Sequence, residues 1–92
     1  MTLKENLLVT VSEECDEVGQ AVSKALRFGC SAENIADIMI ELYQLCAVVE
    51  MCQAEGILPI HSSDYRDEIM NEKKVKVLKY QEMSRTLGTL EG

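Results

Sequence analysis

Residues 12–29 read SEECDEVGQAVSKALRFG, and they combine the pattern of a packed helix face with a high density of negative charge. Apolar side chains recur at spacings of three and four along this part of the chain, as on one face of an α-helix. They are Leu7, Val11, Val18, Ala21, Ala25 and Phe28. Glu14 falls in the middle of that series, and Gly29 is suited to the left-handed position that follows many helices. The pattern predicts a helix over residues 2–28 with a carboxylate on its packing face.

Two more helices are predicted after the first. Ser31 is a suitable cap for the second helix, which is expected to run to about residue 55, just before Gly56. Its apolar face is expected to comprise Ile35, Ile38, Leu42, Leu45, Val49 and Cys52. The third helix is expected to run from about residue 64 to residue 87.

The composition indicates one small all-α domain over residues 1–92. The chain has one proline, five glycines and no tryptophan, and most of it is rich in helix-forming residues. A formal net charge of −7 repels the phosphate backbone of nucleic acids, so a nucleic-acid partner is not expected. No apolar run approaches the roughly 20 residues of a membrane span, so a membrane partner is not expected either.

The cysteines indicate a reducing compartment. Cys15, Cys30, Cys46 and Cys52 form no Cys-x-x-Cys pair, and no hydrophobic signal segment precedes them. We expect free, buried thiols in a cytoplasmic protein. A structural zinc site is not expected, because the single histidine lies away from any close pair of cysteines.

Acidic residues accompany the apolar faces of both long helices. Glu14 and Glu17 are neighbours one turn apart on the first helix, and Glu41 and Gln44 have the same spacing on the second. If the helices pack antiparallel, the two pairs can face each other, and a hard divalent cation such as Mg²⁺ relieves the repulsion between their carboxylates. The alternative is an ordinary solvated helix face, which is common for glutamates.

These residues carry a family resemblance. Four segments in order resemble the small, phage-type members of the MazG-like, all-α nucleoside triphosphate pyrophosphohydrolases. They are SEECDEVGQAVSKALRFG, NIADIMIELYQLCAVVEM, EGILP and KKVKVLKYQEMSRTLG. The family signature is Glu-x-x-Glu followed by Glu-x-x-Asp; Glu14 and Glu17 match the first part, and Glu41 and Gln44 match the second incompletely.

The resemblance implies Mg²⁺-dependent cleavage of a nucleoside triphosphate into its monophosphate and pyrophosphate, with Mn²⁺ as a possible substitute. It implies Glu14, Glu17 and Glu41 as catalytic metal ligands, with Gln44 at the fourth ligand position. By the same resemblance the third helix supplies substrate-binding residues, namely Lys73, Lys76 and Tyr80. It also implies a helical bundle completed in a homodimer or homotetramer, located in the cytoplasm, or in the host cytoplasm if a phage encodes the chain.

Gln44 departs from the family pattern, which has an aspartate there. An amide oxygen carries no net charge and is a poorer Mg²⁺ ligand than a carboxylate. Asp37 compensates only if it turns toward the same site. Two functions therefore stay open, a pyrophosphohydrolase with an impaired metal site and a non-catalytic protein that sequesters a nucleotide.

Two cations follow the acidic stretch on the first helix. Lys24 and Arg27 are near enough for a phosphate chain to reach toward them, but cations near a helix C-terminus are also favourable without a ligand. A structural role, in pairing with acids of a neighbouring subunit, is the preferred interpretation.

Overall fold

The computed structural model describes residues 1–91, and within them it contains three α-helices and no strand. The helices are α1 (Leu3–Phe28), α2 (Ala32–Ala54) and α3 (Ser63–Thr86). The prediction of an all-α chain with three main helices is confirmed. Each predicted helix end lies at the observed position or within about one residue of it, as expected when caps and glycines mark the ends.

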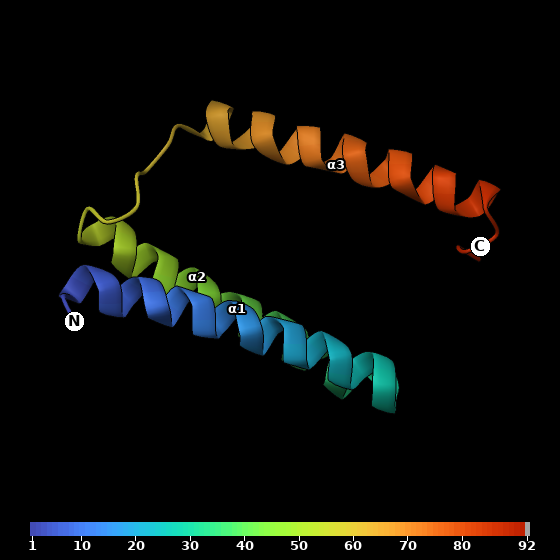
Figure 1. Ribbon diagram of the computed structural model, residues 1–92, viewed down its shortest axis with the longest axis horizontal. Coiled ribbons are helices and arrows are strands. Elements are labelled where there is room, and N and C mark those ends of the chain that lie inside the picture. The colour runs from blue at the N-terminus through green and yellow to red at the C-terminus, as the bar shows by residue number, and fades with distance from the viewer. Residues whose placement is uncertain (92) are drawn as a thin grey trace. The chain divides into compact units, whose positions relative to one another are not determined.

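The chain divides into two compact units. The first, Met1–Pro59, contains α1 and α2, and the second begins at Ile60 and contains α3. In Figure 1 the colour runs from blue at the N-terminus to red at the C-terminus, so α1 is blue to teal, α2 is green and α3 is orange. The prediction that residues 1–92 form a single domain stays a prediction.

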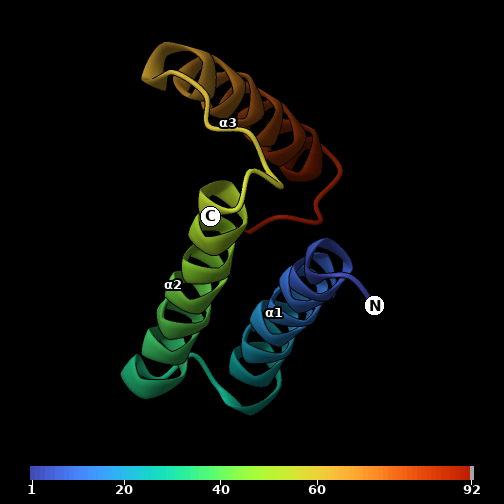
Figure 2. The same cartoon turned by 90° about the vertical axis from the view of Figure 1, so that its left-hand side faces the viewer.

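In the first unit, α1 and α2 lie side by side and run in opposite directions, joined by a short turn (Figures 1 and 2). Gly29 forms this turn with a φ of 116°, which side chains with a Cβ rarely adopt. The Ser31 hydroxyl accepts a hydrogen bond from the Asn34 amide at 3.1 Å, and the Asn34 side chain donates to the Gly29 carbonyl at 2.8 Å. These contacts satisfy polar groups that the helix ends leave without partners, so the local sequence fixes where the chain reverses.

The core of the helix pair is narrow. Leu7, Ala25 and Cys52 are its buried apolar residues, and most other members of the two predicted apolar faces are half-buried. Phe28 is 74% exposed and Ile35 is 48% exposed, so the helix pair alone does not cover them, and their burial by a partner subunit stays a prediction. Both lie beside the turn between the helices, where neither α1 nor α2 extends far enough to cover a large side chain.

Glycines also end the other two helices. Gly56 has a φ of 70° and allows the Ile57 amide to donate to the Cys52 carbonyl at 2.8 Å. Gly88 has a φ of 78°, and the Thr89 amide donates to the Ser84 carbonyl at 2.9 Å. Both arrangements are Schellman-type ends, in which glycine supplies the left-handed residue that the motif needs.

The α3 helix of the second unit begins at a serine cap. Ser62 accepts a hydrogen bond from the Tyr65 amide at 3.3 Å, and the rings of His61 and Tyr65 are in contact with centroids 4.5 Å apart. None of the three helices within residues 1–91 is both long enough and apolar enough to span a bilayer.

Three of the four cysteine thiols are more exposed to solvent than predicted. Only Cys52 is buried; Cys15, Cys30 and Cys46 are exposed free thiols, so the expectation of buried thiols is wrong for these three. The apolar stripes contain Cys52 but not Cys15 or Cys46, and this difference in helical register explains the difference in burial.

Candidate metal centre

Three carboxylates from two helices meet on the α1–α2 pair. One carboxylate oxygen each from Glu14, Glu17 and Glu41 lies within 4.8 Å of the other two. Glu14 and Glu17 are neighbours one turn apart on α1, and Glu41 approaches them from α2. We call these three residues the acidic triad. Sequence spacing predicted this grouping, and the antiparallel helix pair is what brings it together.

The triad contains two carboxylate oxygens without hydrogen-bond partners. The Oε2 atoms of Glu14 and Glu41 are shielded from solvent and accept no hydrogen bond, although both residues are only half-buried overall. Removing a carboxylate oxygen from water without giving it a donor or a cation is unfavourable. This feature separates the triad from glutamates on a solvated helix face, whose oxygens remain hydrated.

The surroundings raise the pKa of Glu41 above its ordinary value. Partial burial makes the largest contribution, because it disfavours the charged form. A hydrogen bond with the Glu17 carboxyl raises the pKa further, and the negative charges of Glu17, Glu14 and Asp37 act in the same direction. In the absence of a cation, Glu41 therefore retains its proton to a higher pH than an isolated glutamate.

This shift predicts how stability depends on pH. Because the pKa of Glu41 is higher in the folded state, the stability gained from its proton is present below the ordinary pKa and is lost as pH rises through the raised value. We expect Glu41→Gln to raise the thermal midpoint at neutral pH without divalent cations, because the amide carries no charge into the triad. The advantage over the original protein should shrink as the pH falls through the raised pKa of Glu41.

A matched control is Glu50→Gln, which removes one charge from an exposed position of the same helix. Thermal unfolding of both variants and the original protein, followed by circular dichroism between acid and neutral pH, checks the prediction. A difference between Glu41→Gln and the original protein that is the same at every pH contradicts it.

The donor set of the acidic triad fits a hard divalent cation. Mg²⁺ takes carboxylate oxygens, keeps several waters and is commonly bound through only a few protein ligands. Three carboxylates on rigid helices, two of them with an unpartnered oxygen, meet this requirement. Glu17 is the exposed member of the triad, so the open side from which an ion can approach lies next to it.

Lys24 pairs with Asp37 across the two helices, a contact that the sequence pattern does not indicate. Its Nζ lies 3.8 Å from Oδ2 of Asp37 in the same chain, and a contact with acids of a neighbouring subunit stays a prediction. Asp37, considered above as a replacement ligand, is paired with Lys24 and influences the triad through its charge on Glu41. Lys24 has a long side chain with many rotamers, and spacing on one helix gives no signal for a contact across two helices.

The remaining predicted site residues lie outside the acidic triad. Gln44 is an exposed residue of α2, one turn after Glu41. Lys73, Lys76 and Tyr80 lie on α3 in the second unit, are exposed, and are spaced by three and four as on one helix face. Their role in binding a substrate stays a prediction.

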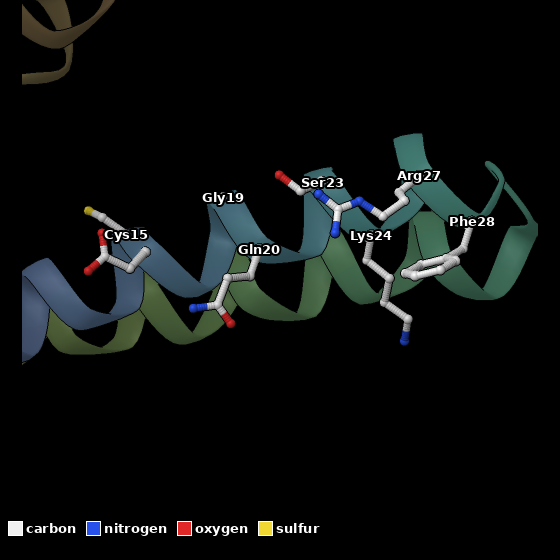
Figure 3. Close-up of a pocket in the computed structure, with 8 residues that line it drawn as sticks. Cys15, Gly19, Gln20, Ser23, Lys24, Arg27 and Phe28 are labelled. Carbon is white, nitrogen blue, oxygen red and sulfur yellow. The ribbon is translucent and has the colours of Figure 1, made fainter.

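Two grooves lie along α1: one is beside the acidic triad, and the other, shown in Figure 3, is lined by residues of α1 between Cys15 and Phe28. The latter passes over Gly19, which has no side chain, and ends near Arg27 and Phe28. Gln20 and Lys24 line this groove and also the groove beside the acidic triad. In Figure 3 the side chains of Gln20 and Lys24 extend to one side of α1, whereas the Arg27 guanidinium lies near Ser23.

No family model matches the chain, and neither the curated proteins nor the solved structures contain a match. The acidic triad and the groove beside it are therefore the structural features that bear on function.

Proposed function

We propose that this chain is a Mg²⁺-dependent nucleoside triphosphate pyrophosphohydrolase, which cleaves its substrate into a nucleoside monophosphate and pyrophosphate. One observation carries the proposal: the acidic triad joins Glu14, Glu17 and Glu41 within 4.8 Å, with two oxygens that lack hydrogen-bond partners. The sequence resemblance supplies the reaction, and the acidic triad supplies a place for the cation that this reaction needs.

In this proposal Glu14, Glu17 and Glu41 hold the cation, Mg²⁺ or Mn²⁺. When bound, the cation offsets phosphate charge and lowers the pKa of a water molecule toward neutrality. The half-buried Glu14 and Glu41 would each offer the cation an oxygen that is shielded from solvent and has no hydrogen-bond partner. The exposed Glu17 faces an open groove with a volume of about 640 Å³, in which phosphates can reach the triad.

The sequence resemblance assigns substrate-binding roles to three residues of α3. Lys73 and Lys76 are proposed to contact phosphate oxygens, and Tyr80 to contact the base or pack beside it. The exposure and shared side of these three residues on α3 support this role.

The second candidate is a protein that binds and sequesters a nucleotide without cleaving it. The observation that favours it is Gln44, an uncharged residue at the position where the resemblance expects the fourth carboxylate. With one negative charge fewer, the site holds a cation less firmly and offers less control over the reacting phosphate.

One experiment separates these functions. The chain is incubated with each common nucleoside triphosphate and Mg²⁺ or Mn²⁺, while pyrophosphate release and thermal stability are measured in parallel. A ligand at about 100 times its dissociation constant stabilises the folded state by about 2.7 kcal/mol. Turnover supports the pyrophosphohydrolase, stabilisation without turnover supports the sequestering protein, and neither effect with any nucleotide contradicts both.

We also propose that a homodimer, or a homotetramer built from it, completes the helical bundle in the cytoplasm. Large apolar side chains of the α1–α2 pair support this, because Leu26, Phe28 and Tyr43 are exposed by 76%, 74% and 64%. A second copy is the occupant that these faces favour, since soluble monomers rarely leave large apolar patches open. Sedimentation at micromolar concentration should show a dimer or larger species, and a single monomeric species of 10.3 kDa contradicts the proposal.

A further inference from the structure

A groove beside the acidic triad contains a single positive charge. The groove is lined by Glu17, Gln20, Ala21, Lys24, Asp37 and Glu41, all from the α1–α2 pair. Among these lining residues, Lys24 is the sole cation. Any anion that enters beside the triad and is not held by a metal ion therefore has Lys24 as its natural partner.

The ammonium group of Lys24 lies within reach of a ligand bound at the triad. Its Nζ is 3.8 Å from Asp37, and Asp37 precedes Glu41 by one turn of α2, a rise of about 6 Å. Along α2, the contact of the Lys24 ammonium with Asp37 therefore lies about one helical turn from Glu41, the nearest triad residue on that helix. A chain of two or three phosphates can extend over this separation. A single phosphate bound to the cation would not reach Lys24.

The contact that now holds Lys24 is weak. The side chains of Lys24 and Asp37 are 55% and 44% exposed, and their separation of 3.8 Å is long for a charge-assisted hydrogen bond. Exposed ion pairs of this kind contribute little to stability and are screened by salt. A polyphosphate with several negative charges can replace Asp37 as the partner of Lys24 without disturbing either helix.

The negative charge around the groove would repel a bound phosphate chain, and Lys24 can offset this repulsion. Glu17, Asp37 and Glu41 line the groove and Glu14 lies beside Glu17 and Glu41, so a single divalent cation offsets only part of the charge of these four carboxylates. A phosphate chain bound to that cation still meets repulsion from Asp37 and from the incompletely neutralised glutamates. Lys24 is positioned to counter this repulsion, while Asp37 competes with the incoming phosphate.

We infer that Lys24 binds a phosphate of a metal-bound polyphosphate, namely one that the cation does not contact, and that Asp37 competes with this phosphate for Lys24. The inference rests on the proposed function, because it requires a cation at the acidic triad. It restricts the ligands to di- and triphosphates and selects against monophosphates. It also assigns opposite effects to two residues that are neighbours in the groove.

The test is calorimetric titration of the full chain with inorganic tripolyphosphate, with Mn²⁺ in excess of the phosphate. Lys24→Gln should weaken tripolyphosphate binding at least tenfold, and Asp37→Asn should tighten it severalfold. Arg27→Gln is the matched control, since it removes one positive charge from α1 a turn further on, outside the groove beside the triad. Its affinity should stay within about twofold of the original, as expected for a distant, screened charge.

The outcomes distinguish this inference from the proposed function. If Mn²⁺ alone does not bind the original protein, the proposed cation site fails and the role of Lys24 fails with it. If Mn²⁺ binds but Lys24→Gln does not change tripolyphosphate affinity, or lowers it no more than Arg27→Gln does, the role of Lys24 is overturned and the cation site stands. Unchanged Mn²⁺ affinity in Lys24→Gln, together with selective loss of tripolyphosphate binding, supports the inference.

Discussion

Glu14→Gln is expected to weaken Mn²⁺ or Mg²⁺ binding at least tenfold, a loss of about 1.4 kcal/mol, while leaving the helix content intact. The amide keeps the shape of the side chain but removes one of three negative charges that lie within 4.8 Å of one another. It also replaces one carboxylate oxygen of Glu14 with an amide nitrogen, which cannot bind a cation. In the original protein, Oε2 of Glu14 is shielded from solvent and has no hydrogen-bond partner. Calorimetric titration with the cation measures the loss, and circular dichroism checks that the variant is folded.

Glu13→Gln is the matched control for this experiment. Glu13 precedes Glu14 in the chain, is exposed, and does not belong to the acidic triad. Its replacement changes the net charge by the same amount and should leave cation affinity nearly unchanged, because exposed charges outside the site are screened. Equal losses in the two variants, or no loss in either, would return these glutamates to an ordinary solvated helix face.

The helix boundaries could be predicted because local contacts determine them. Ser31 and Ser62 accept hydrogen bonds from amides of the helices that follow, and Gly29, Gly56 and Gly88 adopt positive φ values after the helix ends. Each of these signals acts over a few residues and needs no knowledge of tertiary contacts. This explains why boundaries inferred from sequence agree with the structure.

Burial was harder to predict, because periodicity identifies the face of a helix but not the length of its contact. Leu7 and Cys52 are buried as their stripes indicate, whereas Phe28 and Ile35 continue the same stripes and are exposed. The difference arises from tertiary position, since the last two residues lie beside the turn between α1 and α2. No local pattern reports where a partner helix stops.

The acidic triad, unlike the extent of burial, could be predicted from the positions of its residues along the two helices. Glu14 interrupts an apolar stripe, and Glu41 lies beside one, so two antiparallel helices bring these carboxylates together. The pairing of Lys24 with Asp37 was not predictable, because a long side chain can choose among several partners around its helix. Rigid backbone positions follow from the sequence pattern more directly than the ends of flexible side chains.

Gln44→Asp is expected to increase both cation affinity and turnover. The substitution adds a negative charge one turn after Glu41 and completes the Glu-x-x-Asp pattern that the resemblance predicts. Because Gln44 is exposed, the shorter aspartate is accommodated without repacking the core. A tenfold increase in rate corresponds to a barrier about 1.4 kcal/mol lower, a modest demand on a charged ligand beside a metal-bound phosphate.

Gln44→Asn is the control, because asparagine has the size of aspartate without its charge. Pyrophosphate release by the three proteins at equal Mg²⁺, measured with each common nucleoside triphosphate, separates the effect of charge from that of length. A gain in Gln44→Asp alone supports an enzyme whose metal site lacks one carboxylate. If Gln44→Asp binds the cation more tightly yet releases no pyrophosphate from any substrate, the missing ligand does not explain the inactivity. The shielded oxygens of Glu14 and Glu41 would then serve a cation that anchors a nucleotide, and the sequestering function would replace the enzymatic one.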